Sequence, residues 1–373
     1  MSAIEMKDAP SALGFYAKAV LNGFSAKGGA LPTLTVSQRD VRIDRAHLTE
    51  YNRVCGFAVR DTLPSTYLHV LTFDLQMRVM TDKAFPFALL GLVHISNDIT
   101  QLRPVRADEV LRFTTTATNL QPHDKGVTFD LLSKAFVGDE HVWTGVSTYL
   151  RRQAVAKDSG STKRPSTAEA RALVKAKKVG SANAYWQVPA DIGRRYGAIS
   201  GDRNPIHLYA VTAKLLGFPQ AIAHGMWTKA AALAAMESIL PKAYTVSVQF
   251  KLPVLLPAKV AFSNELGATK TSFTVADARK GKPHLAGTIT DLAPAKAQPK
   301  AAPAVKTAPK AAPKAAVKAE AKPEVKAAPK TAAKPKPPAK AAPAAKPAAT
   351  TKPKPASKAA VKPAIKPKAK PKA

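Results

Sequence analysis

Long hydrophobic runs are scarce in this chain of 373 residues. The longest apolar run, residues 87–93, is far shorter than the ~20 residues that a helix needs to cross a bilayer. Residues 1–23 mix Glu5, Asp8 and two lysines with short apolar stretches, so they lack the continuous apolar segment of a signal peptide. We therefore expect a protein with no transmembrane segment and no targeting signal.

Cysteine occurs once, at Cys55. A single thiol excludes a disulfide framework and a cysteine-based metal site, and it agrees with a reducing, cytoplasmic location. The histidines and carboxylates show no spacing typical of metal ligands. We expect neither a metal ion nor a cofactor.

Aromatic residues are absent from residues 293–373, which consist almost entirely of Lys, Ala and Pro. This segment holds 21 Lys, 17 Pro and 2 Glu, so it carries +19 of the formal net charge of +32. So little apolar surface cannot form a core, and we predict a disordered tail that resembles the C-terminal tails of linker histones. Its charge suits a polyanion such as DNA or RNA, bound without sequence preference because no aromatic side chain is available for stacking. A passive, solubilising tail is the alternative.

The remaining residues repeat one order of predicted elements: a strand, a short helix, a long helix and a meander of strands. The first set is predicted at 34–43, 44–55, 65–80, 88–95, 109–120, 127–137 and 141–150, with Asp44 as a helix N-cap. The second set is predicted at 185–188, 190–199, 226–240, 244–250, 259–265, 272–278 and 284–291, with Pro189 at the first helical position. Similar hexapeptides, WTGVST at 143–148 and LAGTIT at 285–290, support a duplication.

This pattern predicts an α+β fold in which each half wraps an antiparallel sheet around a long helix. The predicted boundaries are residues 1–150 for the N-terminal half, 151–184 for a basic linker, 185–292 for the C-terminal half and 293–373 for the tail. A short helix at 168–178 is expected inside the linker.

The chemistry gathers in residues 196–213 of the C-terminal half. Asp202, Asn204 and His207 place a carboxylate, an amide and an imidazole around one turn, which Gly201 and Pro205 shape. The carboxylate and the imidazole can exchange protons, and the amide can hold a water molecule between them. Such a set suits the addition or removal of water across an activated C–C bond. The alternative is a purely structural turn, in which Asp202 caps a helix and His207 packs against its neighbours.

The spacing over these residues resembles the signature of the MaoC-like (R)-specific enoyl-thioester hydratases and 3-hydroxyacyl-thioester dehydratases, which have the hot-dog fold. Residues 222–226, Ile-Ala-His-Gly-Met, are similar to the family's Ile-x-His-Gly-Met. The resemblance implies a double hot dog, with Asp202 and His207 as the catalytic pair and Asn204 as the residue that positions water. It also implies that the backbone of Gly225 binds the thioester carbonyl. A helix N-terminus favours negative charge, which agrees with that role.

Residues of the second long helix are candidates for the acyl pocket, namely Thr228, Leu233 and Met236. Core packing explains Leu233 and Met236 equally well. Arg194, Arg195 and Lys229 are candidates for the phosphates of coenzyme A or the acidic face of a carrier protein, although a merely solvated basic face is the alternative.

The N-terminal half has the scaffold without the motif. Leu63-Pro-Ser-Thr66 stands at the start of its long helix, and no Gly-Asp-x-Asn-Pro-x-His precedes it. The resemblance implies that this half has lost its site and widened an acyl tunnel. We interpret His69 and His94 as packing or surface histidines rather than metal ligands.

The sequence therefore predicts reversible hydration of trans-2-enoyl thioesters of coenzyme A or acyl carrier protein, in fatty-acid metabolism. The fold is expected to act as a monomeric double hot dog or as a homodimer of it. The first alternative is a non-catalytic module that binds acyl thioesters and is tethered to nucleic acid or a granule by its tail. The second is a thioesterase, which shares the fold but not the motif.

Overall fold

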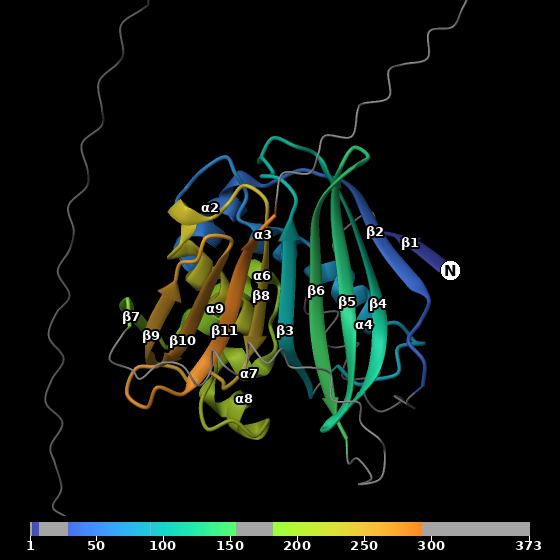
Figure 1. The fold of residues 1–373 in the computed structure, drawn as a ribbon. Coiled ribbons are helices and arrows are strands. Elements are labelled where there is room, and N and C mark those ends of the chain that lie inside the picture. Colours follow the sequence, from blue (N-terminus) through green and yellow to red (C-terminus); the bar gives the residue numbers. More distant parts are fainter. Residues whose placement is uncertain (1, 7–28, 90, 154–181, 293–373) are drawn as a thin grey trace, which may run out of the picture. The chain divides into compact units, whose positions relative to one another are not determined.

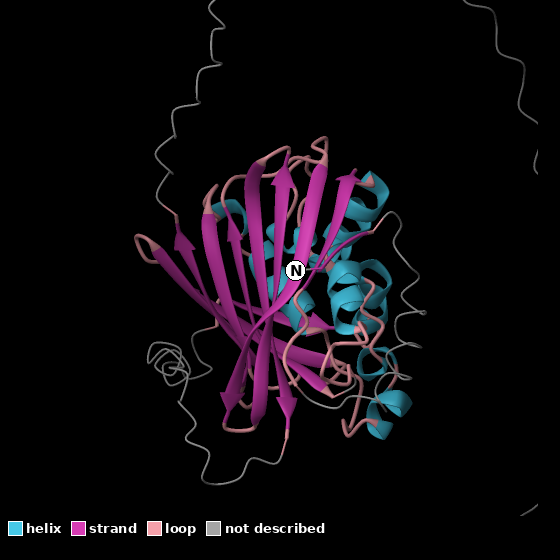
Figure 2. Cartoon of the chain, turned by 90° about the vertical axis from the view of Figure 1, so that its right-hand side faces the viewer, coloured by secondary structure: helices cyan, strands magenta, loops and turns pink. Residues whose placement is uncertain are grey.

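The structure of the protein is a computed structural model that describes residues 2–6, 29–89, 91–153 and 182–292. The predicted basic tail and the predicted helix at 168–178 lie outside the described residues. The described part is built on one sheet of eleven strands, and the helices pack on one face of that sheet (Figures 1 and 2). Within it, no helix is long and apolar enough to cross a membrane.

The sheet is continuous through both halves of the chain, in the order β1-β2-β4-β5-β6-β3-β8-β11-β10-β9-β7. The strands of the N-terminal half are β1 (Ser2–Glu5), β2 (Leu34–Val41), β3 (Leu92–Gln101), β4 (Leu111–His123), β5 (Gly126–Val137) and β6 (Glu140–Arg152). Those of the C-terminal half are β7 (Ala184–Val188), β8 (Tyr244–Phe250), β9 (Ala258–Glu265), β10 (Lys270–Asp277) and β11 (Pro283–Asp291). All neighbouring strands are antiparallel except β1 and β2, which are parallel.

The strand order is symmetric about the junction between β3 and β8. These two strands are antiparallel, and their pairing begins with Ser96 opposite Gln249 and ends with Gln101 opposite Tyr244. Outward from that junction, β6, β5, β4 and β2 on one side correspond to β11, β10, β9 and β7 on the other. The two similar hexapeptides therefore lie on corresponding strands, β6 and β11. This arrangement is what the predicted duplication requires, and the predicted double hot-dog class is confirmed by the structural relatives described below.

Helices cover one face of each half. They are α2 (Arg45–Cys55), α3 (Ser65–Leu71) and α4 (Phe73–Met80) in the N-terminal half, and α6 (Ile192–Ser200), α7 (Pro205–Leu208), α8 (Ala210–Leu215), α9 (Gly225–Ala234) and a 3-10 helix (Glu237–Ile239) in the other. Asp44 caps α2 as predicted, because its carboxylate accepts from the backbone N–H groups of Ala46 and His47. The short helices α7 and α8 were not predicted.

Both predicted long helices are shorter in the structure. The helix expected at 65–80 is interrupted at Thr72, whose hydroxyl donates to the carbonyl of His69 and accepts from Gln76. The helix expected at 226–240 begins at Gly225 and ends at Ala234. Pro241 cannot continue a helix, and only a single 3-10 turn precedes it.

Two further boundaries were wrong. The strand expected at 88–95 is β3, which begins at Leu92 and runs on to Gln101 through the polar residues 96–98. Those residues are strand because β3 is paired on both sides, with β6 and β8. Pro189 does not begin α6; it opens a turn, and the helix starts at Ile192.

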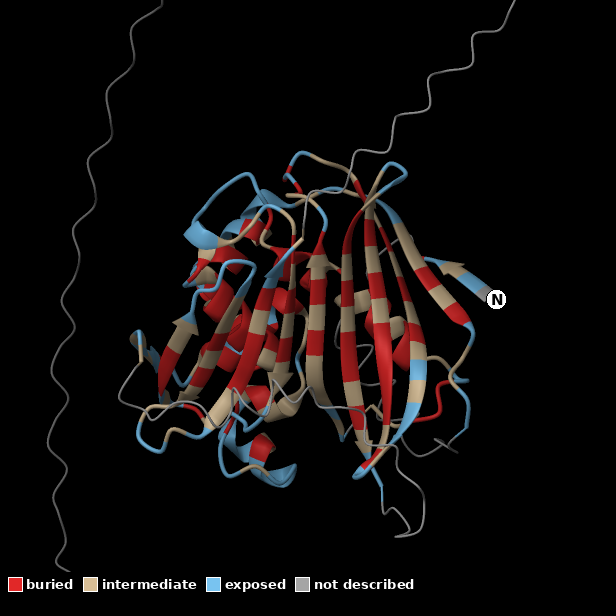
Figure 3. Ribbon diagram, in the orientation of Figure 1, coloured by how far each residue is buried: buried red, intermediate tan, exposed pale blue. Residues whose placement is uncertain are grey.

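The core lies between the sheet and the helices, where red stripes of buried residues alternate with tan ones along the strands (Figure 3). Two tryptophans tie helices into this core through their indole N–H groups. Trp143 on β6 donates to the carbonyl of Ser65 at 2.9 Å, and Trp227 on α9 donates to the carbonyl of Val54 at 3.0 Å. The second bond joins a helix of each half, so the halves are packed as one core.

Lys229 is wholly buried, and its ammonium nitrogen is 2.6 Å from the side-chain oxygen of Asn97. It also contacts the carbonyls of Asn97 and Val246, at 3.1 and 3.2 Å, on the two strands that join the halves. Burial lowers the pKa of Lys229 to about 7. The idea that Lys229 receives phosphates is therefore wrong, because its charge faces the interior of the sheet junction.

Candidate active site

The motif residues lie on the loop between α6 and α7 and on α7 itself. This loop packs directly on α6 because two glycines, Gly193 and Gly197, face it four residues apart. A Cβ on Gly193 would overlap the carbonyl oxygen of His207, and one on Gly197 would lie 2.9 Å from the carbonyl oxygen of Asp202. The glycine pair therefore sets how closely the segment that carries Asp202 and His207 approaches α6.

His207 is buried on α7, and its Nδ1 lies 2.8 Å from the carbonyl oxygen of Ile222. A carbonyl can only accept, so Nδ1 carries the proton and a neutral ring has its lone pair on Nε2. Burial lowers the pKa of His207, although the charge of Asp202 and the bond to Ile222 act in the opposite direction. At neutral pH the imidazole is thus available as a base.

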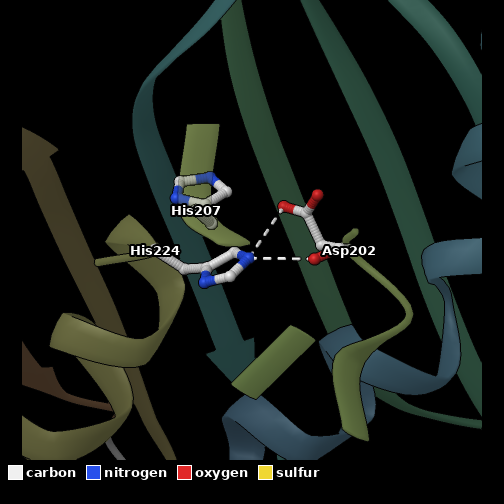
Figure 4. A group of neighbouring side chains, drawn as sticks. All are labelled: Asp202, His207 and His224. Atoms are coloured by element: carbon white, nitrogen blue, oxygen red, sulfur yellow. Dashed lines mark hydrogen bonds and ion pairs between the residues drawn. The ribbon is translucent and has the colours of Figure 1, made fainter. Parts of the chain in front are cut away.

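His224 holds the site together (Figure 4). Its Nε2 donates to the backbone carbonyl of Asp202 at 3.0 Å and lies 3.8 Å from the carboxylate Oδ2. Its ring stacks on that of His207 with centroids 3.6 Å apart. Burial and the neighbouring His207 lower its pKa to about 3, so it stays neutral. The sequence pattern gave His224 no role of its own, yet it contacts both members of the predicted catalytic pair.

Asp202 and Asn204 shape the turn that carries them. Asp202 Oδ1 accepts from the backbone N–H of Asn204 at 3.2 Å, and Asn204 Oδ1 accepts from that of Ile206 at 3.4 Å, which caps α7. The capping residue is therefore Asn204 rather than Asp202. The side-chain oxygen of Asn204 is engaged, so its amide N–H group is what it can offer to a water molecule. The side chain of Asp202 is 31% exposed against 3% for His224, so the carboxylate is partly accessible to solvent.

Gly225 is the first residue of α9, directly after His224, which makes no side-chain capping bond. The first N–H groups of a helix have no partner within it and point towards anions. A Cβ on Gly225 would lie 2.8 Å from Cδ1 of Phe250, so the ring covers this glycine closely. His224 thus connects three groups: it directly precedes the first residue of α9, it bonds the backbone of Asp202, and its ring stacks on that of His207.

A metal ion fits this group poorly. One oxygen of Asp202 and one ring nitrogen each of His207 and His224 lie within 4.8 Å of one another. A ring nitrogen offers its lone pair in the plane of its ring. The two rings are stacked with centroids 3.6 Å apart and their planes differ by only 26°, so their lone pairs lie in two separate, nearly parallel planes and are poorly placed to meet at one ion. The arrangement suits hydrogen bonds to water, and the absence of a metal stays a prediction.

Comparison with known proteins assigns the chain to a family. The model of the MaoC like domain matches residues 165–288. The 3-hydroxyacyl-thioester dehydratase X of Mycobacterium tuberculosis is 38% identical over 263 residues, which are 70% of this chain and 91% of that protein. This chain belongs to the MaoC-like dehydratase family. The crystal structure of M. tuberculosis HtdX is similar with a TM-score of 0.60 and 35% identity, covering 69% of this chain and 100% of the other. A MaoC-like dehydratase from Phytophthora capsici shares the fold, with a TM-score of 0.55 and 19% identity over 71% and 95% of the two chains.

The N-terminal half of this MaoC-like protein lies within electrostatic reach of the site. Burial lowers the pKa values of His69 on α3 and His94 on β3 to about 3, and in both the charge of Asp202 acts in the opposite direction. His94 stacks on Tyr149 at 4.7 Å between centroids and meets Phe250 at 4.9 Å. His69 is buried and His94 is half-buried against two aromatic rings, so the packing interpretation agrees with the structure.

The candidate acyl-pocket residues lie in the core, and the two candidate arginines lie at or near the surface. Thr228, Leu233 and Met236 are all buried, and the hydroxyl of Thr228 donates to the carbonyl of His224 at 3.2 Å. Their contact with an acyl chain stays a prediction. Arg194 lies on the surface, where one guanidinium nitrogen donates to the carbonyl of Leu208 at 3.2 Å, and Arg195 is half-buried.

Proposed function

We propose that this MaoC-like protein interconverts trans-2-enoyl thioesters and (3R)-3-hydroxyacyl thioesters by adding or removing water. The observation that supports this most directly is the set formed by the partly exposed Asp202 carboxylate, the neutral His207 with its Nε2 lone pair, and the adjacent start of α9 at Gly225. Acid–base groups and a site for developing negative charge are the two requirements of this reaction.

In the hydration direction, His207 Nε2 accepts a proton from a water molecule held by Asp202 and the amide of Asn204. The water oxygen bonds to C3, and the electrons of the C2–C3 double bond move through C2 to the thioester oxygen. The backbone N–H at Gly225 stabilises that enolate. The enolate collapses when the imidazolium returns the proton to C2, so the net change is the addition of one water. Asp202 stabilises the imidazolium while it exists.

The substrate is proposed to be a thioester of coenzyme A or of acyl carrier protein. We also propose that the protein acts in the cytoplasm. The decisive assay follows the ultraviolet absorbance of the enoyl thioester, with crotonyl and longer acyl groups. We expect the absorbance to fall as water adds, with no free thiol released. Binding without any loss of absorbance would favour the non-catalytic module, and release of thiol would favour a thioesterase.

The tail is proposed to bind polyanions by charge alone. The support is its sequence, with 21 Lys in residues 293–373. Truncation after Leu292 should leave turnover of a small thioester unchanged and largely abolish binding to duplex DNA. For the full chain, binding should be independent of DNA sequence and fall steeply with salt, with a log–log slope of about −7 if about 8 phosphates are engaged. Binding that survives truncation would place the basic site elsewhere.

A further inference from the structure

The segment directly after the catalytic turn exposes large apolar side chains. Of the eleven exposed large hydrophobic residues in the described part of the chain, four lie between residues 209 and 216. They are Tyr209, Val211, Leu215 and Leu216, with exposed fractions of 57%, 71%, 81% and 43%. Scattered exposed hydrophobic residues are ordinary, but a cluster on one short segment marks an interaction surface. We call these four residues the α8 surface.

Exposed basic side chains occur on and near the α8 surface. Lys214, within α8, and Arg203 and Arg194 are all exposed, and the Arg194 guanidinium lies 5.2 Å from the ring centre of Tyr209. Among residues 192–236, all of them described, the one acidic residue is Asp202 of the active site. The stretch of chain that carries the apolar cluster is therefore basic, with the active-site carboxylate as its one acidic group.

The α8 surface is fixed to the catalytic turn. Tyr209 follows His207 by two residues, and the Thr212 hydroxyl bonds the carbonyls of Pro205 and Tyr209, at 2.7 and 3.0 Å. Ala213 anchors the inner side of α8, because it is fully buried. Figure 1 shows α8 beside α7 at the lower edge of the fold, and Figure 3 shows it mostly exposed. A partner seated here would be held at a set distance from the active site.

We propose that the α8 surface docks an acidic carrier protein that presents the acyl thioester to the active site. This rests on the proposed function, because the partner is defined by the thioester that it delivers. Complementary charge steers such a partner, and the apolar residues provide the contact once it has arrived. The contact need not be strong, since the tethered substrate adds its own binding in the active site.

Two other occupants fit less well. A second copy in a two-fold contact would bring Lys214 and Arg194 of the two copies together, so like charges would face each other. A lipid surface would be held by only four apolar side chains, two on the six-residue helix α8 and two at its ends, which gives little buried area for stable membrane binding. An acidic protein avoids both difficulties.

The test compares one acyl group carried by coenzyme A and by an acidic acyl carrier protein, with the full-length chain. The variant is Val211→Ser/Lys214→Glu/Leu215→Ser. Its matched control is Leu266→Ser/Lys280→Glu, which changes an exposed leucine and an exposed lysine in other turns and keeps the same tail. We expect kcat/KM for the carrier-linked substrate to fall at least about tenfold in the variant, and that for the coenzyme A substrate to stay within about twofold. The control should change neither value.

The proposal is overturned if both substrates lose activity alike, or if the carrier-linked substrate loses none. It is also overturned if the variant instead loses binding to anionic phosphatidylserine vesicles, or converts a wild-type dimer to a monomer, with carrier kinetics unchanged. A wild-type protein that turns over neither thioester would refute the proposed function itself. Normal turnover of the coenzyme A substrate without discrimination by the variant would refute only the docking surface.

Discussion

His207→Ala should lower kcat for hydration of an enoyl thioester at least about 100-fold, because the variant lacks the base that takes the proton from water. Asp202→Asn should lower kcat by a similar factor, because the amide lacks the negative charge with which the carboxylate stabilises the imidazolium. Asp202→Asn keeps the size of the side chain, so its thermal unfolding should resemble that of the wild type. His207→Ala removes the ring that stacks on His224, so we expect a lower melting temperature for this variant but a folded protein at the assay temperature. Steady-state kinetics with crotonyl thioester measures both effects.

The two losses should be far from additive, because both side chains act on one water molecule. The pH profile is a separate check. Burial lowers the pKa of His207 below its usual value, so wild-type kcat/KM for hydration should hold from pH 8 down to about 6.5 and fall only as the ring becomes protonated below that. His123→Ala, on a surface hairpin, is the matched control and should leave kinetics unchanged. Near-normal hydration by either catalytic variant would refute the assignment.

The part of the site that the sequence predicted is local. Asp202, Asn204 and His207 lie within one turn, so their spacing alone indicates that they act together. The contact of His224 with both Asp202 and His207 depends on how α9 meets the loop, which spacing cannot show. A signal was present for the supporting helix: Gly193 and Gly197, four residues apart in α6, mark the face on which the loop packs.

In the fold, too, the elements set by local sequence were predicted, and those set by contacts between distant segments were not. The alternating strand β8, Tyr244–Phe250, was predicted to the residue because one of its faces is buried. The polar residues 96–98 of β3 hid its extent, since Asn97 is buried for its bonds to Lys229 and Ser147 rather than for apolar packing. Lys229 itself looked like a surface cation. When a charged side chain is buried against strands that are distant in sequence, the hydrophobic periodicity of its own helix does not reveal it.

Gly225→Val should reduce kcat/KM severely, at least about 100-fold, for any thioester substrate. The proposed step places the thioester carbonyl against the backbone N–H at the start of α9, and loss of such a donor typically costs 100- to 1000-fold in kcat, or about 3–4 kcal/mol. A branched side chain would cover that N–H. It would also collide with Phe250, because even a Cβ would lie 2.8 Å from the ring. Kinetics of Gly225→Val alone therefore cannot separate blocked substrate from a displaced ring.

A second pair of variants separates the two causes. Phe250→Leu removes the atoms nearest to Gly225 and should by itself cost stability more than chemistry, because the ring packs against His94. In Gly225→Ala/Phe250→Leu the added methyl group then has room, yet it still stands over the N–H that the carbonyl must reach. We expect this double variant to remain at least about tenfold below Phe250→Leu in kcat/KM, with a similar melting temperature. Equal activity of the two would mean that glycine is required only for packing against Phe250, and that the thioester carbonyl is bound elsewhere.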